Sequence, residues 1–147
     1  MELNYSIWFM LVGSFIIQFF IMSLIMTDSI TNITFSLGKF YISVIMALLM
    51  GILEVIMFDS HMKTFHLFYY LVLGFLLVFF IYIYKNQIYI EDKEYLKEMI
   101  EHHSMAILTS EEILQKTESE RVKKLAENII NIQEKEILYM NELKNNL

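Results

Sequence analysis

Two short segments near the C-terminus contain side chains that can bind a metal ion. Met99 lies three residues before His102 and four residues before His103, and residues with these spacings share one face of an α-helix. About thirty residues later an amide, a carboxylate and a thioether recur at similar spacing: Gln133, Glu136 and Met140. The chain has no cysteine, so soft ligands must come from histidine and its 11 methionines. Imidazole with thioether suits copper, particularly Cu(I), and imidazole with carboxylate also accepts zinc, iron or nickel.

Each of these residues also has a structural interpretation, which the spacing leaves open. His103 facing Glu136 would form a polar pair that fixes the register of two helices. Met99 and Met140 suit a hydrophobic core, and His102 suits a solvated surface. The sequence has no H-E-x-x-H or E-x-x-H motif, which disfavours a zinc protease and a di-iron centre. No nucleophile–base pair or phosphate-binding loop is evident, so we expect a protein that is not an enzyme.

Two amphipathic helices, at about 92–115 and 118–145, are expected to position these residues. In the first helix a stripe alternates spacings of four and three: Leu96, Ile100, His103, Ile107, Ser110 and Leu114. In the second helix the same alternation runs through Val122, Leu125, Ile129, Ile132, Glu136, Tyr139 and Leu143. Such stripes face a partner helix, and the short turn between them predicts an antiparallel hairpin. Thr117 and Glu120 fit a capping box, which starts the second helix near residue 118.

One polar residue interrupts each stripe, at nearly the same level of the hairpin. Side chains on a helix point towards its N-terminus, so His103 and Glu136 are expected to lean towards each other. The two helices, about 57 residues, are too small to enclose a core of their own. We therefore predict that two copies pair into a four-helix bundle, which makes the protein a homodimer.

The first 88 residues predict a membrane region with spans at about 5–26, 40–58 and 67–84. Hydrophobic residues make up 56% of the chain, and there is no proline. The first run has no charged residue over about 33 Å of helix, enough to cross the hydrocarbon core. It is too long for a signal peptide and no basic residue precedes it, so we expect it to remain as an anchor in the lipid bilayer.

Glu54 is an ionisable residue inside the second apolar run, and such residues are often functional. It lies about one turn from the end of the run, so it can also reach the interface; a role as a proton site for transport is the least favoured hypothesis.

The acidic charge of the C-terminal part of the chain excludes some classes of binding partner. Residues 91–147 carry 13 acidic and 8 basic residues, which argues against binding nucleic acid and against docking on anionic lipid. Three spans place the hairpin and the 27–38 link on one side of the membrane. The few flanking lysines favour a cytoplasmic hairpin under the positive-inside rule.

The motif Met99-Ile100-x-His102-His103-x-x-Ala106-Ile107, followed by Gln133-x-x-Glu136-Ile137-x-x-Met140, resembles the bacterial family called domain of unknown function 305. The resemblance covers residues 92–145, and a subgroup of the family with three N-terminal spans shares the segment 46–51. It implies a ferritin-like all-α fold: three transmembrane helices in residues 1–88, then a hairpin in residues 89–147 that forms half of a four-helix bundle.

The resemblance also implies a function. Some members of the family are linked to copper handling outside the cytoplasm, which makes four residues the candidate ligands: His102, His103, Met99 and Met140. Glu136 and Gln133 would then support the ligands by hydrogen bonding. Against the lysine count, the resemblance favours a bacterial cell-membrane protein with an extracytoplasmic hairpin that serves metal tolerance or delivery. The non-enzymatic alternative is a hairpin that mediates oligomerisation or binds a partner protein.

The chain departs from the family pattern in four ways, one of which is the interruption of a span by Glu54. It has one copy of the helical pair where many members have two, which fits the predicted dimer. Ser110 stands where many members carry methionine, which removes a soft ligand. Glu101 replaces a frequent proline.

Overall fold

The structure, a computed structural model, describes residues 2–147 and contains helices but no strand within that range. Its described residues form two compact units. One unit comprises the chain up to Ile21 and the segment Leu37–Tyr89, and the other comprises Met22–Ser36 and Ile90–Leu147. The predicted all-helical class is confirmed.

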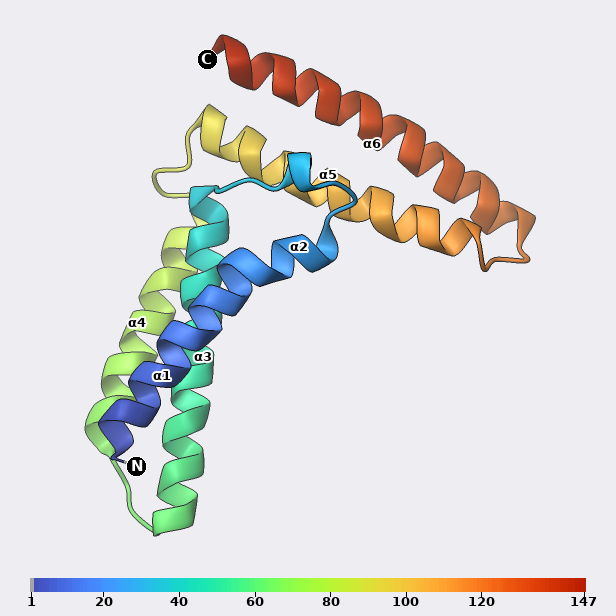
Figure 1. The fold of residues 1–147 in the computed structure, drawn as a ribbon. Helices are drawn as coiled ribbons and strands as arrows, with labels where there is room; N and C mark the ends of the chain where they lie inside the picture. Colours follow the sequence, from blue (N-terminus) through green and yellow to red (C-terminus); the bar gives the residue numbers. More distant parts are fainter. Residues whose placement is uncertain (1) are drawn as a thin grey trace. The chain divides into compact units, whose positions relative to one another are not determined.

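Three apolar helices carry the first unit (Figure 1). These are α1 with its π-helical continuation at Ile17–Ile21, then α3 and α4; their bounds are Leu3–Ile16, Leu37–Met62 and Leu67–Lys85. Counting the short α2 at Met22–Met26, the chain has three helices long and apolar enough to cross a bilayer: Leu3–Met26, Leu37–Met62 and Leu67–Lys85. The three predicted apolar helices are therefore present, and the second extends beyond 40–58 at both ends.

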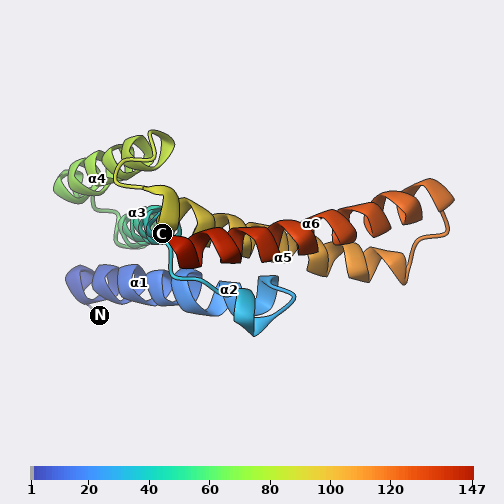
Figure 2. The same ribbon diagram turned by 90° about the horizontal axis from the view of Figure 1, so that it is seen from above.

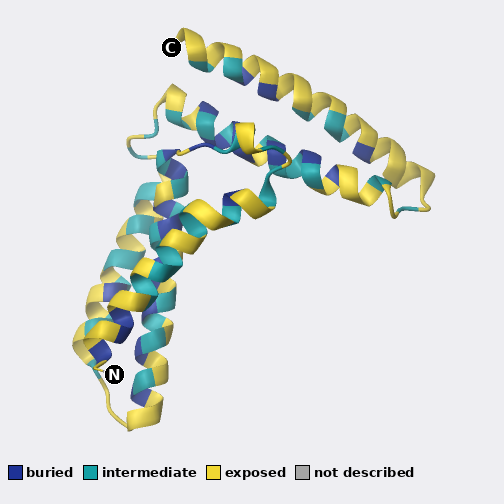
Figure 3. Ribbon diagram, viewed as in Figure 1, coloured by how far each residue is buried: buried dark blue, intermediate teal, exposed yellow. Residues whose placement is uncertain are grey.

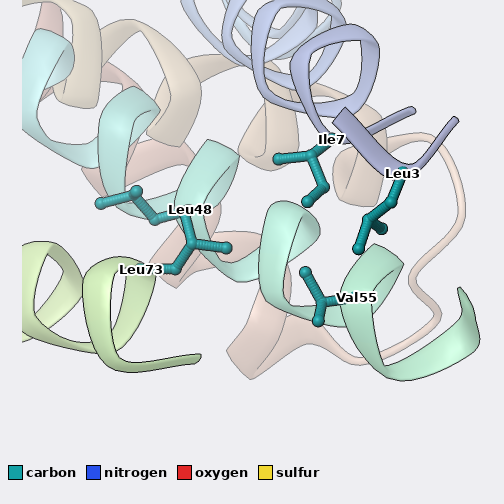
Figure 4. Packing of buried hydrophobic residues seen from close by; sticks show 5 residues of the cluster. All are labelled: Leu3, Ile7, Leu48, Val55 and Leu73. Atoms are coloured by element: carbon teal, nitrogen blue, oxygen red, sulfur yellow. The ribbon is translucent and has the colours of Figure 1, made fainter. Parts of the chain in front are cut away.

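A single apolar cluster holds these helices together (Figure 4). Its buried members come from all three helices: Leu3, Ile7, Leu48, Val55 and Leu73. Gly51 allows α1 to approach α3 closely, since a Cβ atom there would lie 2.8 Å from Leu11 Cδ2. Only 6%, 33% and 6% of the most apolar window of each span is buried within the protein. The remaining apolar surface points outwards, as expected for helices surrounded by lipid.

The helices α3 and α4 each end, at their C-termini, in a Schellman motif that lacks the usual glycine. Lys63 and Gln87 have positive φ angles of 54° and 50°. The amide of the residue that follows each one donates to a carbonyl five residues back, Thr64 to Asp59 and Ile88 to Ile83. Asp59 also accepts from the Thr64 hydroxyl at 3.0 Å and from the His66 amide at 2.9 Å. These contacts fix the turn between the second and third spans.

The second unit is an antiparallel hairpin of α5, Asp92–Leu114, and α6, Glu120–Asn146 (Figures 1 and 2). Both views show the two helices running side by side. The segment 22–36, which includes α2 and a 3₁₀ turn at Ile30–Asn32, belongs to this unit and packs on α5. The sequence predicts this segment as part of the membrane region in residues 1–88, most of it in the polar 27–38 link.

The core face of α5 is as predicted, but that of α6 is not. Leu96, Ile100 and Ile107 of α5 are buried. On α6 the buried residues are Ala126, Ile137 and Met140 (Figure 3). Most of the predicted α6 stripe is exposed, by 37–60%: Val122, Leu125, Ile132, Tyr139 and Leu143. The reason is that α6 carries two neighbouring stripes of similar spacing, and the one that contains the small Ala126 packs against α5.

The predicted capping box at the start of α6 is wrong. Thr117 Oγ1 accepts from the amide of Ser119 at 3.2 Å, which is a local turn, and the helix starts at Glu120. Ser119 occupies the N-cap position without a side-chain capping hydrogen bond. Threonine competes for nearby amides in turns as well as in caps, and here the turn wins.

Candidate functional site

His103 is the centre of the candidate site on the hairpin. Its Nδ1 atom lies 2.7 Å from the carbonyl oxygen of Met99, and its Nε2 atom lies 2.8 Å from Glu136 Oε2. The predicted approach of His103 and Glu136 is therefore confirmed. The side chain of His103 is 20% exposed and that of Glu136 is 50% exposed, so the pair lies at the edge of the hairpin core.

The two neighbours of the imidazole ring determine what the ring can bind. A carbonyl oxygen only accepts, so Nδ1 carries a proton that it donates to Met99. Nε2 then faces the Glu136 carboxylate, a group that attracts cations. A metal-bound histidine is commonly held in this way, with the second ring nitrogen donating to a backbone carbonyl.

Met99 and Met140 lie next to this pair. Met140 belongs to the buried cluster of the hairpin, and Met99 packs against the same cluster. Met99 precedes His103 by four residues and Met140 follows Glu136 by four. In an antiparallel hairpin whose His103 meets Glu136, this spacing puts the methionines at one level, about 6 Å along the axis from the polar pair. Two thioethers, an imidazole and a carboxylate therefore occupy adjacent layers.

The other two predicted residues differ in exposure. His102 is exposed on α5, and Gln133 is half-buried on α6. Among residues 2–147, no three His, Asp or Glu side chains lie close enough to hold a metal ion. A metal ion on a single hairpin would therefore require the methionine sulfur atoms as ligands.

A second polar group, which the sequence analysis did not identify, is centred on Glu101. This buried carboxylate accepts from Ser23 Oγ at 2.5 Å and from the amide of Thr34 at 3.0 Å. The Thr34 hydroxyl donates to the carbonyl of Lys97 at 2.7 Å. One turn along α5, Ser104 Oγ accepts from the Asp28 amide at 3.1 Å. The face of α5 beside its core stripe thus binds the 22–36 segment.

Two sequence features could have indicated this second group. The 22–36 segment is rich in hydroxyl and amide side chains, and Glu101 falls beside the apolar stripe rather than opposite it. Periodicity alone does not say which non-local segment covers such a residue.

Glu54 lies in the first unit and is hydrogen-bonded to another span. Ser6 of α1, which is 5% exposed, donates its hydroxyl to Glu54 Oε1 of α3. This contact satisfies the carboxyl group within the helical bundle.

Comparisons with known proteins give a consistent result. The profile described as Domain of unknown function (DUF305) matches residues 87–144. An uncharacterized protein, L153 of Acanthamoeba polyphaga mimivirus, is 34% identical over 143 residues, which cover 95% of this chain and 91% of that protein. No solved structure matches the chain.

Proposed function

This chain belongs to the DUF305 family, and we propose that its hairpin binds a transition metal ion, most favourably copper, through His103. The role would be metal tolerance or delivery at a membrane, without catalysis. The bacterial origin and the extracytoplasmic hairpin stay predictions, and the similar protein L153 is viral.

The observation that carries the proposal is the pair of acceptors around the His103 ring. Nδ1 faces the Met99 carbonyl and Nε2 faces the Glu136 carboxylate, at 2.7 and 2.8 Å. The ring is thus held with one nitrogen directed at a site that attracts a cation. A metal ion bound at Nε2 would keep the hydrogen bond from Nδ1 to Met99, and with it the orientation of the ring.

The donor set favours Cu(I) over harder ions. Met99 and Met140 supply soft thioethers within an apolar cluster, and Cu(I) prefers such ligands. Glu136 supplies a negative charge that compensates the ion. Zinc would need further nitrogen or carboxylate ligands, and no group of three His, Asp or Glu is available in residues 2–147.

The test is a competition titration of Cu(I) between the full chain in detergent and a chromophoric chelator. We expect His103→Ala to abolish binding and Glu136→Gln to weaken it by about 10–100-fold. Exchanging both Met99 and Met140 for leucine, which conserves volume, should weaken Cu(I) binding and spare the fold. Met105→Leu and His61→Ala are matched controls outside the site. Equal binding by the wild type and the His103→Ala variant would refute the proposal.

A second candidate function, self-assembly, is favoured by the exposed stripe on α6. Its heptad spacing is that of a seam between helices, and Glu136 interrupts it at the centre, which disfavours burial in lipid. In one antiparallel pairing of two α6 helices, Ile129 meets Ile132 of the second copy. Arg121 then lies beside Glu142 of that copy, an opposite charge. If the pairing is shifted by one heptad in either direction, Lys135 lies beside Arg121 or Lys135 of the second copy, which is a like charge. The charges therefore favour the first pairing.

Charge exchange tests this assembly. Arg121→Glu and Glu142→Arg should each lower the dimer fraction of the full chain, measured by light scattering in detergent, and the combined variant should restore it. Lys123→Glu, which lies off the seam, is the control. A monomer at all concentrations, or no recovery in the combined variant, would exclude this pairing.

The two functions also differ at one residue. If the His103–Glu136 contact is only a register device, His103→Leu should leave the stability unchanged or raise it. If the contact is a metal site, the same change should abolish the stabilisation that added Cu(I) gives to the wild type.

A further inference from the structure

The second unit contains a basic cavity on the opposite end of the hairpin from the α5–α6 turn. Its volume is about 440 Å³. Three lysines from two helices line it together with residues of the 22–36 segment: Lys93, Lys97, Lys144, Ile33, Thr34 and Phe35. Asn145 completes the lining. The cavity thus combines positive charge, neutral polar groups and an apolar wall.

The charge of this cavity contrasts with that of its surroundings. Residues 91–147 carry 13 acidic and 8 basic residues, yet three of those 8 line this cavity and no acidic residue does. Neighbouring groups hold two of the three in place: Lys97 pairs with Glu94 at 2.5 Å, and Lys144 Nζ donates to Asn141 Oδ1 at 2.8 Å. Glu94 offsets the charge of Lys97, and Glu91 and Asp92 line an adjacent hollow together with Lys93, so the excess of positive charge is confined to the lining of this cavity. An anion in the cavity would relieve the repulsion between the ammonium groups.

The position of the cavity along the chain indicates where such an anion would come from. Phe35 lies two residues before Leu37, the first residue of the second span. Two residues of extended chain cover about 7 Å, so Phe35 stays close to the level at which the span leaves the hydrocarbon core. Lipid phosphates occupy that interfacial layer. Ile33 and the 58%-exposed Phe35 provide apolar contacts that a free ion does not need.

We propose that this cavity binds the phosphate group of an anionic phospholipid headgroup. The ammonium groups of Lys93, Lys97 and Lys144 contact the phosphate oxygens, and Ile33 and Phe35 contact the glycerol and the start of the acyl chains. The site is separate from the proposed metal site, which uses none of these residues. It also refines the expectation that the acidic hairpin avoids anionic lipid, because that expectation describes net charge and the cavity is a local exception.

The experiment measures the thermal unfolding midpoint of the full chain in a neutral detergent by circular dichroism. The added probes are dihexanoyl phosphatidic acid, dihexanoyl phosphatidylcholine and inorganic phosphate. We expect phosphatidic acid to raise the midpoint with a dependence on concentration that gives an apparent Kd. Lys93→Gln/Lys97→Gln/Lys144→Gln should weaken that Kd at least about tenfold, since three charge-assisted contacts are lost. The matched control, Lys123→Gln/Lys124→Gln/Lys135→Gln, removes the same charge elsewhere in the unit and should keep the affinity.

The outcomes separate the possible ligands. A shift with phosphatidic acid that greatly exceeds the shift with inorganic phosphate supports the lipid assignment, and equal shifts overturn it in favour of free phosphate. No shift with any probe, or equal weakening in both triple variants, overturns the site itself. Lys93→Gln alone, which removes a lysine without an ion pair to Glu94, should weaken binding severalfold and covers the case in which the triple variant unfolds.

Discussion

Glu54 and Glu101 are both carboxylates set among apolar neighbours on a helix, and the two units treat them differently. Glu54 in the first unit accepts from the hydroxyl of Ser6 on the adjacent span. Glu101 in the second unit is surrounded by a folded segment, which supplies Ser23 Oγ and the amide of Thr34. A span needs few internal contacts because lipid covers its outer surface, whereas the hairpin must build a cover from its own chain.

The apolar cores differ in the same way. The core of the first unit lies along a narrow seam, and large residues such as Phe9, Phe68 and Phe75 point outwards with 72–75% exposure. The hairpin core has five buried members and one half-buried neighbour. In water each of these few residues carries a large share of the stability, and in lipid the hydrophobic effect between helices is absent. Mutations of equal size should therefore have unequal effects in the two units.

The largest expected effect is the loss of a core side chain in the hairpin. Ile107, which is 2% exposed, should cost about 3 kcal/mol of unfolding free energy when changed to alanine. Leu48→Ala in the first unit should cost clearly less, because lipid replaces part of the lost contact. Chemical denaturation of both variants in the same detergent measures the two values. Equal costs would show that the first unit is stabilised as a water-soluble core would be.

The next effect is the removal of the buried carboxylate. Glu101→Ala leaves the amide of Thr34 and the hydroxyl of Ser23 without their acceptor, which should cost about 2–3 kcal/mol. Hydrogen exchange of residues 27–36 should rise sharply in this variant. Glu111→Ala, an exposed change on the same helix, should leave exchange as it is. Unchanged protection of this segment would mean that its packing does not depend on Glu101.

A smaller effect is expected at the corresponding contact between the spans. Ser6→Ala removes the donor to Glu54 and should cost about 0.6 kcal/mol, the average for a hydrogen bond between membrane helices. Ser14→Ala on the same helix serves as the comparison, and both are measured by unfolding in mixed micelles. A cost above that of Glu101→Ala would reverse the ranking of the two carboxylates.

Much of this contrast could be predicted from the sequence, and the exceptions have physical reasons. Long apolar runs with at most one charged residue predict membrane-crossing helices, and the lean of side chains towards the N-terminus of each helix predicted the contact of His103 with Glu136, although most of the predicted α6 stripe is exposed. The face of α6 could not be assigned because two stripes of similar spacing compete, and packing with Ala126 decides between them. The contacts of Glu101 join residues 67 to 78 positions apart, which local patterns do not encode.

The candidate metal ligands divide along the same line. Spacing within a helix grouped Met99 with His103, and the structure has the His103 ring in contact with the Met99 carbonyl, because helical geometry is local. Periodicity also separated the two histidines, because His103 falls in the α5 stripe and His102 outside it, and the structure has His103 in contact with Glu136 of α6. The family resemblance, in contrast, made both histidines candidate ligands.

The smallest predicted effect compares the turns of the two units. Lys63 between the second and third spans has a φ angle of 54°, a conformation that costs a side chain about 1 kcal/mol and glycine nothing. Lys63→Gly should therefore raise the unfolding midpoint slightly, by the equivalent of about 0.5 kcal/mol after the added chain entropy. Among residues 2–147 the non-glycine residues with a positive φ angle are Lys63, Gln87 and Tyr89. The α5–α6 turn therefore contains no residue with a positive φ angle. Thr117→Gly in that turn should lower the midpoint, because it adds chain entropy and removes the acceptor of the Ser119 amide. If Lys63→Gly and Thr117→Gly shift the unfolding midpoint in the same direction, the prediction is wrong. Backbone strain at Lys63 would then not distinguish the two turns.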